Sequence, residues 1–298
     1  MSNPEQYQLS YIIATYNRIS FLQVTLQKLL DNLQPLEEVV IVDAGSTDGT
    51  KEYLQILYEK GEIHQFISEP DRNQAHGWNK AMLLARGEII KKIIDDDVFC
   101  YGAIRKCKNY MLFNPQVDIV ISNDLNSSIT APDIIEKANR LSQFTQWTEK
   151  KIESFTFGDV HLLIRRSSIS FTGLYNTSFI MMDWEYSLRL SHLQTRIVYY
   201  TGYNALSVYH GKSISATRDL DKIRLQGKKG EIFYNYSGDQ SDISLWSKIK
   251  IHIGKFISRK RKPVVDEDIT QDNLISIYTL FYTYIDSLNE DDNFTFLS

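Results

Sequence analysis

Short apolar runs alternate with segments of helical spacing along the first third of the sequence, and this alternation constrains the fold more than any other feature. Each apolar run has the length of a strand, and each following segment repeats apolar residues at helical intervals. The predicted strands lie at 9–14, 38–42, 63–68 and 88–94, and the predicted helices between them lie at 21–33, 50–60 and 74–85. Strands separated by helices in this way predict an α/β fold, with a Rossmann-like, mostly parallel sheet and helices on both faces.

Polar residues follow the predicted strands. The first strand runs into residues 15–18, the second into residues 43–49 and the fourth into Asp95, Asp96 and Asp97. In open α/β sheets, ligands bind at the carboxyl ends of the strands. We therefore expect the chemistry of this protein at that edge of the sheet.

The pattern changes after about residue 215. Before this point the sequence predicts a strand at 118–122, a loop at 123–128, a strand at 155–166 and a helix at 181–193. After it, the alternation stops, and the sequence predicts helices joined by charged linkers. We therefore expect two parts, an α/β domain over 1–215 and a helical extension over 216–298.

The composition favours a cytoplasmic enzyme or binding protein. A formal net charge of -4 on 298 residues argues against a dedicated nucleic-acid binder, which usually has a basic excess. Cys100 and Cys107 form no CxxC motif, which disfavours a zinc site or a disulfide framework. The first residues, MSNPEQYQLS, lack the pattern of a signal peptide, and no window reaches the roughly 18 consecutive apolar residues that predict a membrane span.

Three successive aspartates, Asp95, Asp96 and Asp97, stand where the fourth predicted strand leaves the core. Their mutual repulsion is unfavourable unless cations or hydrogen-bond donors surround them. Mg²⁺ and Mn²⁺ take oxygen ligands, usually one or two carboxylates together with substrate phosphates. The cluster therefore predicts a site for a metal-diphosphate complex, with a solvated acidic turn as the alternative.

Two further aspartates follow the second predicted strand. Asp43 directly follows the strand, where its carboxylate is in place to hydrogen-bond a base or a ribose, as acidic residues do in dinucleotide folds. Asp48 stands at a predicted N-cap position of the next helix, and capping alone explains an aspartate there. The alternative for both is a plain strand-to-helix turn, with Gly45 at its tight point.

Asp183, Glu185 and His210 are candidate site residues of the second half of the sequence. Asp183 and Glu185 lie two apart on a predicted helix, so they cannot share one helix face and should have different roles. One of them could act as a general base on an acceptor hydroxyl, and the alternative is a solvated helix face. The imidazole of His210 could bind a metal or a phosphate, and the alternative is a structural histidine.

Five motifs occur along the chain in a fixed order: YIIATYNR, IVDAGSTDGT, SEPDRNQAHGWNKAMLLARGEI, IIDDDVF and MDWEYSLRL. In this order they resemble the family 2 glycosyltransferases, which have the GT-A fold and transfer a sugar from a nucleotide-diphosphate donor. The resemblance covers roughly residues 8–215 and is nearest to bacterial enzymes that build surface polysaccharides. The residues after 215 resemble no part of that family.

The resemblance implies a nucleotide-sugar site built from several of these motifs. The implied residues are Thr15, Asn17, Arg18, Asp43, Ser46, Arg72, Gln74, Asn79, Asp95, Asp96 and His210. Two positions depart from the family pattern. Ala44 stands where relatives commonly have a second acidic residue, and His76 stands where they often have aspartate.

The resemblance also implies a cofactor, Mn²⁺ or Mg²⁺, at the family's DxD element. That element matches Asp95 to Asp97, and the main metal ligands are either Asp95 with Asp97 or Asp96 with Asp97. His210 would be a further ligand, since His210 with Ser213 resembles a His-x-x-Ser element that closes over the donor.

For catalysis, the resemblance implies a general base at Asp183. This residue matches the aspartate of a D-x-D/E-x-x-x-R-L pattern, with Glu185 and Arg189 following. One direct displacement would then invert the anomeric centre. The expected donor is a UDP-hexose, and the expected acceptor is a hydroxyl of a glycan or of a lipid-linked molecule.

A basic segment with interleaved apolar residues lies within the predicted extension, at 246–262. Its basic residues are Lys248, Lys250, Lys255, Arg259, Lys260, Arg261 and Lys262. A helix of this kind can lie on an anionic membrane, which would make the protein peripheral on the inner face of the cell membrane. The alternative is a helix packed on the core with a solvated basic tail.

Two other functions compete with glycosyl transfer. A nucleotide-sugar-binding or scaffold protein with a decayed active site is suggested by Ala44 and His76. The retention of Asp95 to Asp97 together with Asp183 speaks against it. A nucleotidyltransferase that makes the sugar donor could have a similar sheet and metal site. It should carry a glycine-rich, basic loop after its first strand, and here that loop is ATYNR.

Overall fold

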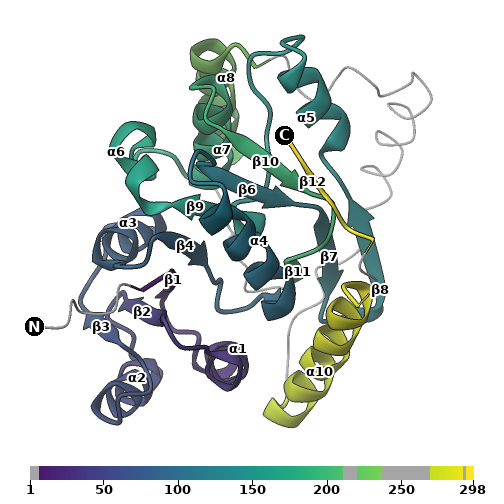
Figure 1. Ribbon diagram of the computed structural model, residues 1–298. Coiled ribbons are helices and arrows are strands. Elements are labelled where there is room, and N and C mark those ends of the chain that lie inside the picture. Colours follow the sequence, from purple (N-terminus) through teal and green to yellow (C-terminus); the bar gives the residue numbers. More distant parts are fainter. Residues whose placement is uncertain (1–6, 211–219, 237–268, 291–292) are drawn as a thin grey trace, which may run out of the picture.

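The computed structural model describes residues 7–210, 220–236, 269–290 and 293–298, which form a mixed α/β structure around one large sheet (Figure 1). Strands and helices alternate in its first part, as the sequence predicts. The elements there are β1 (Leu9–Thr15), α1 (Ile19–Asn32), β2 (Glu37–Asp43), α2 (Thr50–Glu59), β3 (Gln65–Ser68), α3 (Gln74–Leu84) and β4 (Ile89–Lys92).

The middle of the chain adds a second set of strands and helices. These are β5 (Val98–Phe99), α4 (Tyr101–Phe113), β6 (Ile119–Ser122), β7 (Asp124–Ser128), β8 (Ala131–Ala138), α5 (Leu141–Thr148), β9 (Leu163–Arg165), α6 (Ile169–Thr172), α7 (Met182–His192), β10 (Ile197–Tyr200) and β11 (Ala205–Tyr209). Helix α8 (Leu220–Tyr234), helix α10 (Gln271–Leu288) and strand β12 (Phe296–Leu297) follow.

The central sheet has eight strands in the order β12-β10-β6-β9-β4-β1-β2-β3. Its β4-β1-β2-β3 half is parallel throughout, β6 and β10 are also parallel, and β9 and β12 are the antiparallel members. A smaller sheet, in the order β5-β11-β7-β8, lies beside it. The predicted α/β fold with a mostly parallel sheet is therefore confirmed.

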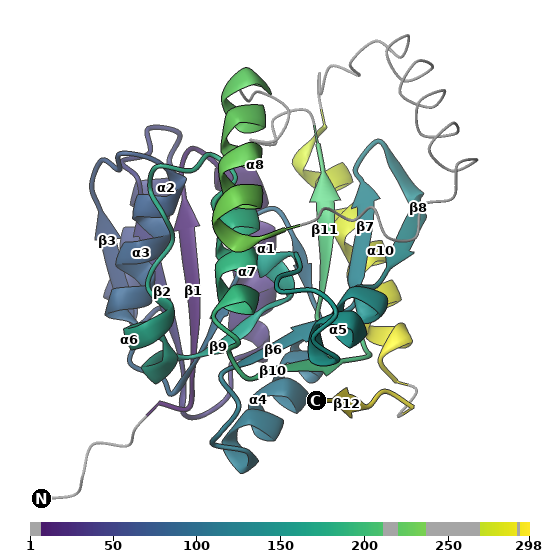
Figure 2. The same cartoon turned by 90° about the horizontal axis from the view of Figure 1, so that it is seen from above.

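Helices cover both faces of the central sheet. Because side chains alternate along each strand, neighbouring residues of a strand are buried in different cores. On β1, Leu9, Tyr11 and Ile13 belong to the larger hydrophobic core with residues of α1, α2 and α4, whereas Ile12 belongs to a second core with residues of α3 and α7. Figure 1 shows α1 and α2 on one side of the strands and α3 on the other, and Figure 2 shows the same layers from above. Two helical layers thus fix the strand ends that carry the site.

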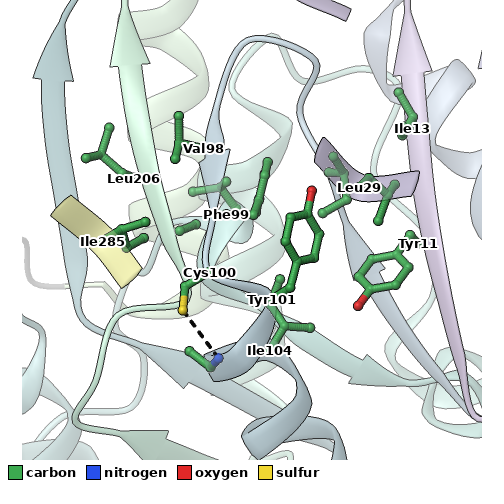
Figure 3. Packing of buried hydrophobic residues seen from close by; sticks show 14 of the residues in the cluster. Tyr11, Ile13, Leu29, Val98, Phe99, Cys100, Tyr101, Ile104, Leu206 and Ile285 are labelled. Carbon is green, nitrogen blue, oxygen red and sulfur yellow. Dashed lines mark hydrogen bonds between the residues drawn. The ribbon is translucent and has the colours of Figure 1, made fainter. Parts of the chain in front are cut away.

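Helix α10 and strand β12 pack onto the elements that precede them. Ile285 of α10 lies among Val98, Phe99 and Leu206 in the larger core (Figure 3). Strand β12 pairs antiparallel with β10 at one edge of the central sheet. The boundary predicted at residue 215 stays a prediction, and the described residues beyond it share a core and a sheet with those before it.

The structure corrects two predictions of secondary structure. Residues 124–128, predicted as loop, form β7. Their side chains are mostly polar, but their backbone pairs with β11 on one side and β8 on the other. Of residues 155–166, predicted as one strand, only β9 is a strand. Phe155 and Phe157 belong to irregular chain and are buried in the second core, so their apolar alternation reflects burial and not pairing.

The helices give no membrane span. In the described parts of the chain, every helix is too short or too polar to cross a membrane. The basic segment at 246–262 lies outside the described residues.

Candidate active site

A cavity of about 830 Å³ opens at the carboxyl ends of β1, β2 and β4. Strand β11, the first turn of α7, and α3 with the chain before it complete its wall. Its lining residues are Ala14, Thr15, Tyr16, Arg18, Ala44, Pro70, Asp71, Asn73, Gln74, Gly77, Trp78, Ile94, Asp95, Asp96, Asp97, Asp183, Ser207, Val208 and Tyr209. The cavity lies at the edge of the sheet where the sequence predicts the chemistry.

The turn made by Asp95, Asp96 and Asp97, called the aspartate turn below, is held by hydrogen bonds from several elements. Thr15 Oγ1 donates to Asp95 Oδ2 at 2.6 Å, and the backbone N–H of Val208 donates to Asp97 Oδ1 at 2.8 Å. All three aspartates are at most 7% exposed, yet all three line the cavity. The turn is therefore fixed before any ligand binds.

Asp96 has two cationic or polar partners of its own. Arg18 Nη1 donates to Asp96 Oδ2 at 2.5 Å, and His210 Nε2 lies 2.7 Å from the same oxygen. The guanidinium and imidazole also meet, since Arg18 Nη1 lies 3.1 Å from His210 Nε2. The structure thus brings Arg18, Asp96 and His210 together from three distant parts of the chain.

The three carboxyl groups differ in their affinity for protons. Burial, together with the charge of Asp96, raises the pKa of Asp95 to about 7 and raises the pKa of Asp97 well above its ordinary value. Burial alone would also raise the pKa of Asp96, but the hydrogen bond with His210 and the charge of Arg18 lower it below its ordinary value. Asp96 is therefore the carboxylate of the turn that is most firmly ionised.

The residues of the turn suit a divalent metal that a diphosphate helps to hold. Carboxylate oxygens are ligands that Mg²⁺ and Mn²⁺ favour, and these ions are commonly bound by one or two carboxylates plus substrate phosphates. Within the described ranges, no group of three or more His, Cys, Asp or Glu side chains could hold a metal ion by itself. The donor set therefore fits a shared site, completed by phosphate oxygens, and does not fit a closed protein cage.

Asn17, Asp43 and Ser46 form a hydrogen-bonded group behind the cavity wall. The backbone N–H of Asn17, which has φ 51°, donates to Ser46 Oγ at 2.8 Å, and Ser46 Oγ donates to Asp43. Asp43 also accepts from Ser68 Oγ at 2.7 Å and is fully buried, while its neighbour Ala44 lines the cavity. The base contact expected of Asp43 stays a prediction, and its carboxylate shapes the wall from within.

Asp48 acts locally, as the capping interpretation expects. Its Oδ1 accepts from the backbone N–H and the hydroxyl of Thr50, and its Oδ2 accepts from the N–H of Ile19 at 3.1 Å. The N-cap itself is Gly49, with φ 96°, so Asp48 lies one residue before the N-cap and not at the N-cap as predicted. Its contacts tie the start of α2 to the start of α1.

The segment from Asp71 to Asn79 divides between the cavity and the structure around it. Gln74 lines the cavity, whereas Arg72 is exposed and is not among the lining residues. The side chain of Asn79 forms two hydrogen bonds with the backbone of Tyr175, at 2.9 and 2.8 Å, and so ties α3 to the chain before α7. His76 lies 3.1 Å from Asp71, which also pairs with Lys80 at 2.6 Å.

Asp183 and Glu185 have different surroundings. Asp183, in the first turn of α7, lines the cavity. Glu185 is 1% exposed, pairs with Arg189 through two hydrogen bonds of 3.0 Å and accepts a hydrogen bond from Tyr234. Glu185 thus fixes the helix, while Asp183 faces the space where a substrate would bind.

Several residues at the site were not found from the sequence. Ser207 and Tyr209 line the cavity, Thr25 donates to the backbone carbonyl of Asp95 at 3.0 Å, and Tyr278 donates to that of Asp96. No local pattern marks them, because each reaches the site only through the fold. For Tyr278 the contact spans 182 residues.

Comparison with known proteins agrees with this architecture. The model of a protein family described as "Glycosyl transferase family 2" matches residues 10–171, more than half of the chain. A putative teichuronic acid biosynthesis glycosyltransferase of Bacillus subtilis is 33% identical over 106 residues, covering 35% of this chain and 42% of that protein. The poly-beta-1,6-N-acetyl-D-glucosamine synthase of Staphylococcus epidermidis is 27% identical over 203 residues, covering 64% of this chain and 47% of that protein. The chain thus spans less than half the length of each of these relatives.

Solved structures show the same fold. A mannosyltransferase from Pyrobaculum calidifontis in complex with GDP-Man and Mn²⁺ has a TM-score of 0.56 at 17% identity, covering 93% of this chain and 87% of that one. S. aureus TarS 1-349 in complex with UDP-GlcNAc has a TM-score of 0.56 at 14% identity, covering 95% and 91%. These likenesses confirm the GT-A fold, and the family match over residues 10–171 establishes that the chain belongs to glycosyl transferase family 2.

Proposed function

We propose that this protein is a metal-dependent, inverting hexosyltransferase. It would move a sugar from a nucleotide-diphosphate donor to a hydroxyl of a glycan or lipid-linked acceptor. The donor we expect is a UDP-hexose. The observation that carries the proposal is the joint lining of one cavity by the aspartate turn and Asp183. A role in bacterial surface polysaccharide synthesis is supported by the names of the relatives, which refer to teichuronic acid biosynthesis and to a poly-beta-1,6-N-acetyl-D-glucosamine synthase.

In this proposal Asp183 is the general base. Its carboxylate takes the proton of the acceptor hydroxyl while that oxygen forms a bond to the anomeric carbon and the bond to the diphosphate breaks. A single displacement from the face opposite the leaving group inverts the anomeric configuration. The buried Glu185 pairs with Arg189, and Arg189 donates to the backbone carbonyls of Thr172 and Leu174. These contacts fix α7 and so position Asp183 for the reaction.

The part of the cavity at the aspartate turn would bind the donor. Of the two pairs that the resemblance implies, Asp96 with Asp97 would hold Mn²⁺ or Mg²⁺ together with the diphosphate. When bound, the metal supplies electrostatic stabilisation for the charge that grows on the leaving diphosphate. Thr15 and Arg18 would complete this part of the cavity, since both line it and both contact the turn.

The first experiment is a thermal-shift panel of UDP-, GDP-, dTDP- and CMP-sugars with and without Mn²⁺, because a ligand that binds only the native state raises its apparent stability. We expect a manganese-dependent shift with one nucleotide class. NMR of the product of that donor and a glycan acceptor should then show an inverted anomeric centre. Absence of any shift from folded protein contradicts the donor site, and binding without turnover supports a scaffold protein instead.

The cellular location is a separate part of the proposal. We place the protein at the cytoplasmic face of the membrane, through the basic segment at 246–262, on sequence alone. Sedimentation with anionic liposomes at low salt is the direct test, with neutral liposomes as the control. Equal recovery with both would contradict membrane attachment and leave the proposed transfer reaction untouched.

A further inference from the structure

Side-chain hydroxyls hold the backbone carbonyls of the aspartate turn from inside the protein. Thr25 of α1 donates to the carbonyl of Asp95 at 3.0 Å and also lies within hydrogen-bond distance, 3.4 Å, of the carbonyl of Asp97. Tyr278 of α10 donates to the carbonyl of Asp96 at 2.5 Å. Buried carbonyls need donors, and a turn has no regular backbone partner to supply them. The two hydroxyls therefore set the backbone of the turn.

Two aromatic rings, those of Phe21 and His210, lie between Tyr278 and the side chain of Asp96. The tyrosine is fully buried, and its ring lies 6.3 Å from that of Phe21. The Phe21 ring in turn stacks on the imidazole of His210, with 4.5 Å between the ring centroids. His210 Nε2 in turn contacts the Asp96 carboxylate at 2.7 Å, so a series of ring contacts connects α10 with that carboxylate.

Helix α10 is a firm support for these contacts. Thr270 caps its first turn by accepting from the N–H of Asn273, and Leu274, Phe281 and Ile285 are buried in the larger core. Figure 3 shows Ile285 in this core, close to the strand that follows the aspartate turn. The helix lies outside residues 10–171, so the part of the chain that matches the family model does not supply this support.

We infer that Tyr278 is a positioning residue for the metal-diphosphate part of the site. It acts through Asp96, whose backbone carbonyl accepts the hydrogen bond of the Tyr278 hydroxyl. The inference rests on the proposed function, since it assigns a role in a site that the proposal describes. Groups that orient metal ligands commonly change metal affinity about 10- to 100-fold when they are removed.

The test is the binding of UDP, GDP and dTDP to the full chain at a series of Mn²⁺ concentrations, measured by titration calorimetry. Tyr278→Phe removes only the hydroxyl. We expect it to raise the Mn²⁺ concentration needed for half-maximal nucleotide binding about 10-fold, with nucleotide binding in EDTA unchanged. Tyr11→Phe is the matched control, because Tyr11 is fully buried and its phenol lies beside Glu37 and Arg105, away from the turn. It should leave the manganese dependence unchanged.

A second variant separates positioning from general loss of stability. If Tyr278 acts through Asp96, Tyr278→Phe should add little to the manganese defect of Asp96→Asn, since coupled residues are not additive. Equal manganese dependence in wild type and Tyr278→Phe, or full additivity of the two substitutions, overturns the inference alone. A wild-type protein that binds no nucleotide with any dependence on manganese overturns the proposed metal site, and the inference falls with it.

Discussion

Strand β4 and the aspartate turn carry buried charges of opposite sign only a few residues apart, and they use them differently. On β4, Lys91 Nζ donates to the carbonyl of Val160 and to Asn204, and Lys92 pairs with Asp159. Lys92 also lies over the ring of Trp78, 4.3 Å from its centroid. Neither lysine lines the cavity, whereas all three aspartates of the turn do.

The difference shows how burial can serve either the fold or the site. The lysines find their partners inside the protein, so their charges belong to the structure of the core. Lys91 is fully buried, and this burial lowers its pKa to about 7. The aspartates are as deeply placed, but they face a space large enough for a ligand. We therefore expect substitutions on β4 and beneath it to change stability, and substitutions of cavity-facing carboxylates to change chemistry or binding.

The largest effect should come from Asp183→Asn, which removes a cavity-facing carboxylate and keeps its shape. We expect turnover to fall about 1,000-fold, because a general base commonly contributes between 100- and 10,000-fold. Donor binding measured by calorimetry should persist. Asp133→Asn, at an exposed position of β8, is the control and should retain full turnover. Near-normal turnover of Asp183→Asn would remove Asp183 as the base.

Lys92→Met should act on stability. Removal of the lysine leaves Asp159 buried without its cation, and breaking a buried pair in this way costs about 3 kcal/mol. Urea unfolding measures the loss, and nucleotide binding to the folded variant should be normal. Lys51→Met, at an exposed position of α2, should change stability by less than about 0.5 kcal/mol. A loss of binding without a loss of stability would break the distinction between the two regions.

Asp96→Asn should weaken metal-dependent donor binding about 10- to 100-fold, which corresponds to about 2 kcal/mol. The substitution removes the charge that Arg18 and His210 share. Calorimetry with and without Mn²⁺ measures the effect, with Asp31→Asn on the exposed side of α1 as the control. Manganese dependence equal to that of wild type would mean that Asp96 belongs with the structural charges.

The most gradual effect should be a dependence of the free energy of unfolding on pH. It should come from His161, which is buried and lies two residues before β9. Burial lowers its pKa from an ordinary 6.5 to about 4, so the unfolded chain binds more protons than the native protein between these values. The contribution of His161 to stability is present above pH 6.5 and is lost as the pH falls toward 4. The slope is at most about 1.4 kcal/mol per pH unit.

Urea unfolding at pH 7, 6, 5 and 4.5 checks this dependence. His161→Gln should lower the pH dependence of the free energy of unfolding in this window. An unchanged slope in His161→Gln would show that the acid sensitivity of the fold arises at other groups.

The sequence predicted the elements whose signals are local. The apolar runs of β1, β2 and β4 and the polar residues after them indicated the sheet, its active edge and the aspartate turn. Strand β7 escaped prediction because its residues are polar and its pairing partners, β8 and β11, include one that lies far along the chain.

Other features could not be predicted because they depend on contacts between distant segments. A lysine pair in a strand looks the same whether it is solvated or buried, so the roles of Lys91 and Lys92 required knowledge of Asn204 and Asp159. Asp43 was expected directly after its strand and is the last residue of β2, but its enclosure by Ser46 and Ser68 depends on side-chain packing. The link from Tyr278 to Asp96 had no signal at either residue.

Strand β12 has a consequence for the behaviour of the protein at high concentration. An unpaired strand at the edge of a sheet is a template for joining other molecules edge to edge. Here two residues, Phe296 and Leu297, cover the backbone of β10, and the ring of Phe296 stacks on Tyr110 with 4.0 Å between centroids. A very short strand, anchored by the ring of Phe296, thus covers this one edge of the sheet against pairing with another molecule while offering little edge of its own.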